Sequence, residues 1–288
     1  MSKVLLLGST GMLGHSVKAV LGANISIDLI STSRIVSDSG IFFDAEAMSV
    51  EKLIEEVQPD FIVNSIGIIK PHIDEKSVNS IQRALDINSS LPNKIAKFVL
   101  NSNIKVIQIA TDCVFSGNDG LYSEDSSHDA LDVYGKTKSL GETVSSNFMH
   151  LRVSIVGPEV GRSTSLLEWF KGQDANAKIN GFKDHLWNGI TTHHFGLICE
   201  GIITKERFTP GVHHIIPSDT VSKDVLLGIF GEAYNRKDIE INPIESQNRI
   251  DRTLKTLRPD FNLQIWKDAG YANPPTIKQM VFEQAKAL

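Results

Sequence analysis

Short, nearly continuous apolar runs alternate along the chain with longer segments whose apolar residues recur at helical spacing. Such runs are typical of strands that are buried on both faces of a parallel sheet. We predict strands at residues 3–8, 25–31, 41–45, 61–65, 105–110, 151–156 and 211–217. The amphipathic segments predict helices at 15–21, 49–57, 78–102 (in one piece or two, divided near Pro92), 133–144, 165–172 and 192–203. This alternation predicts an α/β protein with a Rossmann-type, doubly wound parallel sheet.

The alternation of apolar runs and amphipathic segments changes in two parts of the chain, residues 157–189 and 218–288. In the second of these, helices are predicted at 221–234, 246–257 and 276–287. We therefore expect a first domain over residues 1–156, completed by about 190–217. The two remaining segments, 157–189 and 218–288, are expected to form a smaller, interleaved C-terminal lobe.

Composition and charge narrow the class of protein. Hydrophobic residues make up 41% of the 288 residues and charged residues 22%, which is ordinary for a soluble globular protein. The net charge is −5 and no Lys/Arg cluster occurs, so no nucleic-acid partner is expected. No apolar stretch approaches the roughly 20 residues of a membrane span. Met1 leads directly into a predicted strand, so we expect a cytoplasmic protein without a membrane partner.

Neither a metal site nor a disulfide framework is expected. The chain has two cysteines, Cys113 and Cys199. The adjacent histidine pairs at 193–194 and 213–214 resemble ligand pairs on paper. Because adjacent residues point apart on a helix or a strand, these pairs do not predict a metal site.

A glycine-rich turn, GSTGMLG at residues 8–14, connects the first predicted strand to the first predicted helix. Such a turn brings backbone N–H groups and the positive end of the helix onto a phosphate. Gly8 would form the tight turn, Gly11 would let a pyrophosphate approach and Gly14 would let helix and strand pack closely. We therefore expect a dinucleotide cofactor, bound by Gly8, Thr10, Gly11, Met12, Leu13 and Gly14.

The second predicted strand indicates which dinucleotide binds. An NAD-specific site usually has Asp or Glu at the end of this strand, to bind the ribose 2′-hydroxyl. Here the chain has Ser33 and Arg34, which suit a 2′-phosphate unless Arg34 only solvates a loop. NADP(H) is therefore preferred, and NAD(H) remains possible. Further cofactor contacts are expected where the next strands end, at Asp44, Ala45, Ser65 and Gly67.

Thr111, Tyr134 and Lys138 form the candidate catalytic set. Thr111 follows the predicted strand at 105–110, so its hydroxyl would reach the ligand edge of the sheet and hold a reacting oxygen. Tyr134 and Lys138 are four residues apart on the predicted helix at 133–144, so their side chains share one face. A neighbouring ammonium favours the phenolate, and we expect it to lower the pKa of Tyr134 from its usual value of about 10. A tyrosine tuned in this way can transfer a proton near neutral pH.

Four motifs together resemble the extended short-chain dehydrogenase/reductases, and among these the reductases of dTDP-4-dehydrorhamnose type. They are GSTGMLG at 8–14, ATDCVFSG at 110–117, YSED at 122–125 and YGKTKSLGE at 134–142. The resemblance implies that Tyr134 protonates the carbonyl oxygen of a nucleotide-linked 4-keto-6-deoxysugar while the nicotinamide delivers hydride. Thr111 would hydrogen-bond that oxygen, and Lys138 would bind the nicotinamide ribose. Asn88 matches an asparagine that supports the lysine and a proton-relay water.

The resemblance also implies an NADPH-dependent enzyme of surface polysaccharide synthesis that acts as a monomer or a homodimer. One alternative comes from Cys113, which matches the cysteine of the GDP-fucose synthases. Those enzymes epimerise carbons next to the keto group before they reduce it, and they pair this cysteine with a histidine that is not found at 161–166. The other alternative is a regulatory subunit that binds dinucleotide without turnover. Such a subunit would have no chemical need for the set of Thr111, Tyr134 and Lys138.

The smaller lobe is expected to bind the sugar nucleotide. Trp187 would stack on a base or a sugar ring, although a core tryptophan fits the pattern almost as well. Arg162 has the geometry to bind a pyrophosphate. Lys70 and His72 follow a predicted strand at the ligand edge, so we expect them near the sugar together with Cys113.

Overall fold

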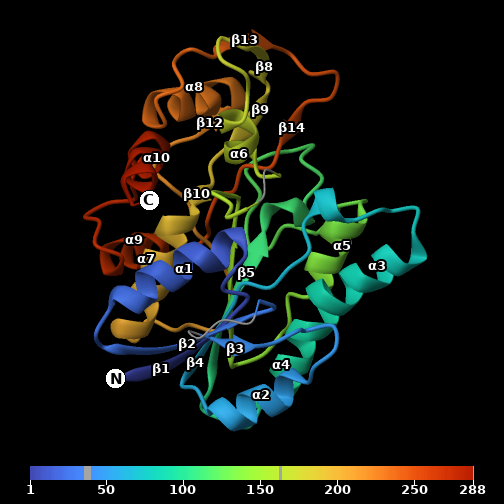
Figure 1. Cartoon of the computed structure of the whole chain (residues 1–288), viewed down its shortest axis with the longest axis vertical. Helices are drawn as coiled ribbons and strands as arrows, with labels where there is room; N and C mark the ends of the chain where they lie inside the picture. The colour runs from blue at the N-terminus through green and yellow to red at the C-terminus, as the bar shows by residue number, and fades with distance from the viewer. Residues whose placement is uncertain (36–39, 162–163, 288) are drawn as a thin grey trace.

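Seven strands form one sheet in the computed structural model, which describes residues 1–35, 40–161 and 164–287 (Figure 1). From edge to edge they are β11 (Gly211–His214), β6 (Phe148–Val153), β5 (Lys105–Thr111), β4 (Phe61–Asn64), β1 (Ser2–Leu7), β2 (Ile27–Ser33) and β3 (Ile41–Phe42). Neighbouring strands in this sheet are parallel. The order runs outward from β1 to β3 on one side and from β4 to β11 on the other. This arrangement confirms the predicted α/β, doubly wound Rossmann-type fold.

Helices cover both faces of the sheet (Figure 1). Their bounds are α1 Met12–Ala23, α2 Val50–Val57, α3 Val78–Leu85, α4 Leu91–Val99, α5 Val133–Leu140 and α7 Thr192–Thr204. Val4 and Leu6 of β1 pack in a hydrophobic core with α1 and α7. Their neighbours Leu5 and Leu7 belong to a second core, which contains residues of α2 and α4. Because both faces of β1 are buried, its sequence is apolar without interruption.

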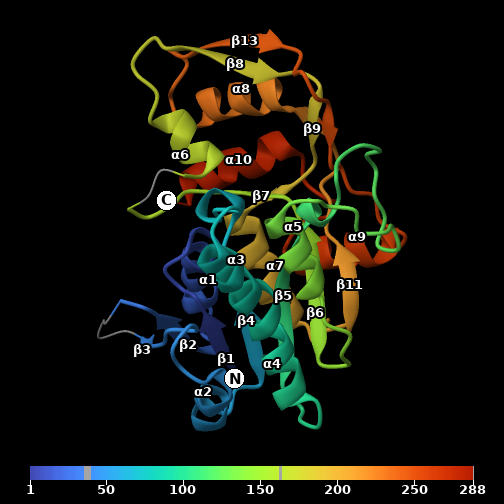
Figure 2. The same cartoon turned by 90° about the vertical axis from the view of Figure 1, so that its right-hand side faces the viewer.

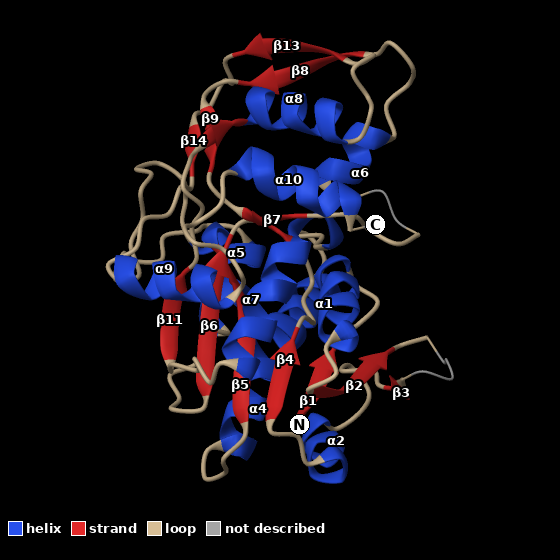
Figure 3. Ribbon diagram, turned by 90° about the vertical axis from the view of Figure 1, so that its left-hand side faces the viewer, coloured by secondary structure: helices blue, strands red, loops and turns tan. Residues whose placement is uncertain are grey.

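A smaller lobe lies over the carboxyl ends of the strands (Figures 2 and 3). It contains α6 (Leu166–Lys171), α8 (Lys223–Ala233) and α10 (Ile277–Lys286). One small sheet pairs β8 (Lys178–Phe182) with β13 (Glu240–Ile244), and another places β9 (His185–Trp187) between β12 (Val221–Ser222) and β14 (Ile250–Asp251). Two short strands, β7 (Ile155–Val156) and β10 (Ile190–Thr191), also pair with each other. Between the segments of the smaller lobe, the chain returns to the large sheet through α7 and β11.

The prediction of a helix at 246–257 is wrong. This segment contains β14 and loops, because its polar groups bond to distant parts of the chain. The backbone N–H of Ser246, for example, donates to the carboxylate of Asp184 at 3.0 Å. The neighbouring helix, α9 (Pro259–Asp268), was not predicted, although Pro259 in its first turn is a typical signal of a helix start.

The long helical segment predicted at 78–102 is divided. α3 ends at Leu85, residues Asp86–Ser90 form a π-helix and α4 begins at Leu91 with Pro92 in its first turn. A π-turn inside a longer helix often marks a functional position. None of the helices in the described ranges is long and apolar enough to cross a membrane.

Candidate functional site

The glycine-rich turn after β1 has the backbone geometry that a phosphate site needs. Gly8 has a φ of +84°, a conformation that glycine adopts without steric strain. A Cβ on Gly14 would lie 2.0 Å from the carbonyl oxygen of Gly8, so only glycine lets α1 pack this close to the turn. α1 begins at Met12 with no side-chain cap and no acidic residue in its first turn. The first N–H groups and the positive end of the helix can therefore stabilise an anion.

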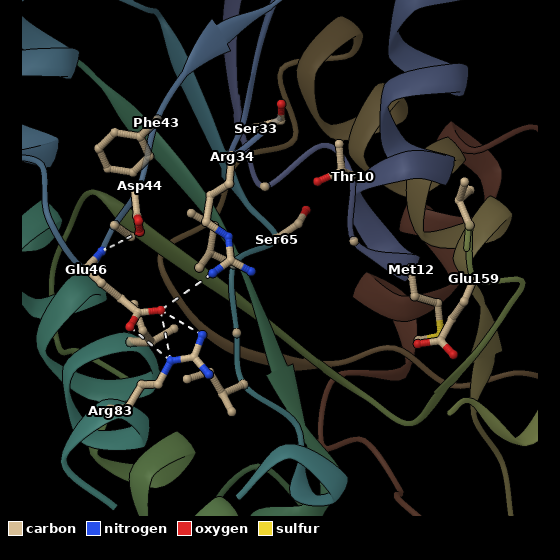
Figure 4. A pocket seen from close by; sticks show the side chains of 18 residues that line it. Thr10, Met12, Ser33, Arg34, Phe43, Asp44, Glu46, Ser65, Arg83 and Glu159 are labelled. Carbon is tan, nitrogen blue, oxygen red and sulfur yellow. Dashed lines mark hydrogen bonds and ion pairs between the residues drawn. The ribbon is translucent and has the colours of Figure 1, made fainter. Parts of the chain in front are cut away.

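A cleft of about 180 Å³ adjoins this turn (Figure 4). The predicted cofactor residues that line it are Gly8, Thr10, Gly11, Met12, Ser33, Arg34, Asp44, Ala45, Ser65 and Gly67. Lining residues that were not predicted are Phe43, Glu46, Ile66, Ile68, Arg83, Ile87, Glu159 and Val160. Leu13 and Gly14 are not part of the lining, because Leu13 is buried in the core and Gly14 packs against Gly8.

A group of charged side chains lies in this cleft (Figure 4). Glu46 accepts hydrogen bonds from Nε of Arg83 at 2.9 and 3.0 Å and from Nη2 at 2.7 Å. Nη1 of Arg34 lies 3.6 Å from the same carboxylate. Asp44 accepts a hydrogen bond from the backbone N–H of Glu46 at 3.0 Å, which orients this loop. The sequence places Arg34 after a strand, but no local pattern relates α3 to this loop, so Arg83 and Glu46 were not predicted.

Thr111, Tyr134 and Lys138 meet at the carboxyl edge of the sheet. Thr111 is the last residue of β5, and its hydroxyl lies near enough to the phenol of Tyr134 to oppose the rise in the pKa of that phenol. α5, which carries Tyr134 and Lys138, begins after Asp132, whose carboxylate accepts the N–H of Gly135 at 2.7 Å. A Cβ on Gly135 would lie 2.4 Å from a backbone carbonyl oxygen of the segment that follows β5. Glycine at this position therefore lets α5 pack closely beside Thr111.

Burial changes the pKa values of Tyr134 and Lys138 more than neighbouring charges do. Lys138 is 8% exposed, and its Nζ donates a hydrogen bond to the carbonyl oxygen of Ile109 at 3.0 Å. Burial lowers the pKa of Lys138 to about 8. The pKa of Tyr134 is raised, because burial and the nearby Cys113 outweigh the opposing effect of the Thr111 hydroxyl. The prediction of a lowered tyrosine pKa is therefore wrong, and the phenol is protonated at neutral pH.

Asn88 connects the lining of the cleft to α5. It lies in the π-helix between α3 and α4 and is 3% exposed. Its amide nitrogen donates to the carbonyl oxygen of Ile68 at 2.9 Å and to the hydroxyl of Thr137 at 3.2 Å. Its amide oxygen accepts the N–H of Ile68 at 2.9 Å. Asn88 thus fixes the cleft-lining loop after β4 against α5, next to Lys138.

Two cations of the smaller lobe influence the pKa of Asp112, next to the candidate catalytic set, and neither was predicted. Lys223 begins α8 and Arg252 follows β14. Burial raises the pKa of Asp112, and the charges of these two cations oppose that rise. Asp112 in turn accepts a hydrogen bond from Thr111 at 3.2 Å. Burial lowers the pKa of Lys223 to about 8, and its ammonium lies 5.5 Å from the centroid of the Trp187 ring.

The predicted substrate residues of the larger domain have different environments. Nζ of Lys70 forms an ion pair with the carboxylate of Asp132 at 2.8 Å, so it contacts the residue that precedes α5. His72 is exposed in the short 3-10 turn (Lys70–His72) that follows β4. Cys113 directly follows Asp112. Burial and that carboxylate raise the pKa of the Cys113 thiol to about 12.

Trp187 is a core residue rather than an open stacking surface. It is 4% exposed, and its Nε1 donates a hydrogen bond to the hydroxyl of Ser154 at 2.8 Å. Arg162, the other predicted substrate residue of this lobe, lies outside the described residues. Within the described ranges, no group of three or more His, Cys, Asp or Glu side chains is arranged to hold a metal ion.

By its architecture the chain is an extended short-chain dehydrogenase/reductase, since its smaller lobe covers the sheet edge at which the threonine of β5 meets the tyrosine and lysine of α5. A sequence model of the family described as the RmlD substrate binding domain matches residues 2–287. The chain therefore belongs to this family, and the predicted resemblance to reductases of dTDP-4-dehydrorhamnose type is confirmed at the level of the family.

Comparison with individual proteins gives two kinds of relative. Methionine adenosyltransferase 2 subunit beta of Bos taurus is 26% identical over 257 residues, which cover 84% of this chain and 75% of that protein. Spore coat polysaccharide biosynthesis protein SpsK of Bacillus subtilis (strain 168) is 26% identical over 232 residues, with coverages of 77% and 76%. The crystal structure of dTDP-4-dehydrorhamnose reductase from Bacillus anthracis in complex with NADP superposes with a TM-score of 0.78 at 15% identity, over 100% of this chain and 99% of that one. At this low identity, the superposition supports the fold alone.

Proposed function

We propose that this protein is an NADPH-dependent reductase that converts the keto group of a nucleotide-linked 4-keto-6-deoxysugar to a hydroxyl group. The observation that carries the proposal is that Thr111, at the end of β5, and Tyr134 of α5 come together at the sheet edge that also holds the cleft beside the glycine-rich turn. Lys138 shares the helix of Tyr134, one turn away. A polysaccharide biosynthesis protein among the relatives supports a role in surface polysaccharide synthesis.

The protonation state of Tyr134 suits reduction. Bound NADPH would supply hydride to C4 of the sugar, and the electron pair of the carbonyl bond would move to the oxygen. Because burial raises the pKa of Tyr134, its phenol holds a proton that it can give to this developing alkoxide. Thr111 would hydrogen-bond the same oxygen and so align it with the phenol. The positive charge of Lys138 would stabilise the phenolate that remains.

The cofactor proposal rests on the lining of the cleft. Gly8, Gly11 and the start of α1 would hold the pyrophosphate, and Ser33 and Arg34 would face the ribose that carries the 2′-phosphate. We propose NADP(H) as the preferred cofactor, with NAD(H) as a weaker ligand. The proposal includes the larger domain as the cofactor domain, the smaller lobe as the substrate lobe, and a cytoplasmic monomer or homodimer.

Reduction without epimerisation is favoured over the combined reaction. Epimerisation next to the keto group needs a base to remove a proton from carbon. The thiol of Cys113, with a pKa of about 12, is protonated at neutral pH and is a poor candidate for that base. Lys223 of the smaller lobe, whose pKa is lowered to about 8, lies close enough to Cys113 for their charges to interact.

A second candidate function is supported by the relatives. Several of them are named methionine adenosyltransferase 2 subunit beta, which is the name of a subunit and not of an independent reductase. A regulatory subunit would bind dinucleotide in the same cleft without turnover.

Consumption of NADPH by the wild type and by Tyr134→Phe, measured with dTDP-, UDP- and GDP-linked 4-keto-6-deoxysugars, tests the proposal. Turnover with one of these nucleotides, abolished in the variant, would support the reductase and identify the nucleotide. NMR analysis of the product would show whether a neighbouring carbon is inverted. Tight NADPH binding with no turnover on the whole panel would favour the regulatory subunit.

A further inference from the structure

The carboxylate of Glu46 lies between two guanidinium groups inside the proposed cofactor cleft (Figure 4). Its contacts with them are unequal. Arg83 binds it with three contacts of 2.7 to 3.0 Å, whereas Arg34 approaches it only to 3.6 Å. Arg83 donates from Nε and Nη2, the two-pronged geometry that makes a strong Arg–carboxylate pair. Glu46 is therefore held mainly by Arg83, and Arg34 keeps most of its capacity to bind another anion.

The exposure of these side chains is consistent with a ligand site. The side chain of Arg34 is 54% exposed, that of Arg83 is 43% exposed and that of Glu46 is 37% exposed. All three line the cleft that the glycine-rich turn also lines. Asp44 acts on the charge of Arg83 as well, so two acidic and two basic side chains nearly balance one another here. A ligand phosphate in this part of the cleft would change that balance.

We propose that the Glu46–Arg83 pair sets the preference of this protein between NADPH and NADH. The inference rests on the proposed dinucleotide function and adds two residues that determine its specificity. A 2′-phosphate needs the positive charge of Arg34 and is repelled by a carboxylate near it. Arg83 engages that carboxylate, so Arg34 is available to the phosphate. NADH has a neutral 2′-hydroxyl at the same position and is much less sensitive to these charges.

Two substitutions should therefore change the preference in opposite directions. In Arg83→Gln, Glu46 loses its main partner and becomes free to pair with Arg34, so affinity for NADPH should fall about three- to tenfold. In Glu46→Gln, the competing negative charge is lost and both arginines face the phosphate, so affinity for NADPH should rise by a similar factor. Affinity for NADH should change by less than about twofold in either variant. The double variant should lie between the two single variants.

Binding of NADPH and NADH to the full chain, measured by calorimetric titration without substrate, tests this inference. Arg207→Gln and Glu240→Gln are matched controls, because each breaks one ion pair outside the cleft, with Asp268 and Lys178 respectively. Thermal unfolding of every variant shows that it is folded. The changes in NADPH affinity should also shrink at high salt, because exposed charges are screened.

The outcomes separate this inference from the proposed function. Opposite changes in the NADPH to NADH affinity ratio, absent from the controls, would support the role of the pair. A ratio that stays constant in both variants, while the wild type binds dinucleotide, would overturn the inference and leave the reductase proposal standing. A wild type that binds neither dinucleotide would overturn both.

Discussion

Replacement of Lys138 by methionine should stabilise the protein at neutral pH while it abolishes turnover. Lys138 is 8% exposed, and burial lowers its pKa from 10.5 to about 8. Below pH 8 the buried Lys138 is charged in the folded protein. The difference between the two pKa values means that this charge destabilises the folded protein by about 3 kcal/mol. Methionine fills a similar volume without a charge, but the hydrogen bond to the carbonyl oxygen of Ile109 is lost, at a cost of about 1 kcal/mol. A net gain of about 2 kcal/mol in the free energy of unfolding is expected.

The pH dependence of this gain is a sharper test than its size. The pKa of Lys138 is lower in the folded protein than in the unfolded chain. Between pH 8 and 10.5 the unfolded chain therefore binds more protons, and the stability of the wild type rises with pH through this lysine. Methionine does not titrate, so the advantage of Lys138→Met should be full near pH 7 and should disappear near pH 10. Denaturant unfolding of both proteins over this pH range measures the difference between their free energies of unfolding. The contributions of all other titrating groups cancel in this difference.

Lys136→Met is the matched control, because Lys136 lies on the same helix and is exposed. This control should change the free energy of unfolding by less than about 0.5 kcal/mol at any of these pH values. NADPH consumption with the accepted sugar nucleotide should be lost in Lys138→Met and retained in the control. The reasoning is refuted if Lys138→Met is less stable than the wild type at pH 7, or if its advantage is the same at pH 7 and pH 10.

Three shorter predictions concern Tyr134, Gly14 and His194. Tyr134→Phe should lower turnover by about 10²- to 10⁴-fold in an NADPH assay but keep NADPH binding, because only the proton-donating hydroxyl group is removed. Gly14→Ala should cost about 2 kcal/mol or more on denaturant unfolding and should weaken dinucleotide binding, because the new methyl group would lie 2.0 Å from the Gly8 carbonyl oxygen. Gly228→Ala is its control, since nothing lies within 4 Å of the added carbon. Burial lowers the pKa of His194 from 6.5 to about 4, so stability should fall as pH drops from 6.5 to 4, and His194→Gln should flatten that fall in acid unfolding curves.

Each of these predictions has a result that contradicts it. Near-normal turnover by Tyr134→Phe would mean that another group donates the proton. Equal stability of the Gly14→Ala and Gly228→Ala variants would show that α1 does not need its close approach to the turn. An acid unfolding curve that is unchanged in His194→Gln would assign the fall to other groups, such as the carboxylates.

The sequence was sufficient to predict the structure wherever a local pattern is compatible with only one local structure. The uninterrupted apolar run of residues 3–8 predicts a strand with both faces buried, and Leu5 and Leu6 do lie in different cores. The glycine spacing predicted the turn, since Gly8 needs a positive φ and Gly14 leaves no space for a side chain. The four-residue spacing of tyrosine and lysine predicted a shared helix, which ends at Leu140 and not at residue 144.

The sequence was insufficient wherever a residue takes its role from a distant part of the chain. Arg83 enters the cleft only because α3 packs near the loop that contains Glu46. Lys223 and Arg252 act on Asp112 only because the smaller lobe covers the sheet edge. The segment 246–257 has apolar residues at helical spacing, but its hydrogen bonds to other loops outweigh that local preference.

The protonation state of the catalytic set is a further property that spacing alone does not predict. The four-residue spacing of Tyr134 and Lys138 predicted an ammonium group beside the phenol, and therefore a lowered pKa for Tyr134. In the folded chain, burial shifts every titrating group of the set toward its neutral form, since it raises the pKa of Tyr134 and lowers that of Lys138. A neutral phenol is the form that a reductase needs, because it must donate a proton. The same burial makes the charge on Lys138 costly, so removal of this lysine should stabilise the fold.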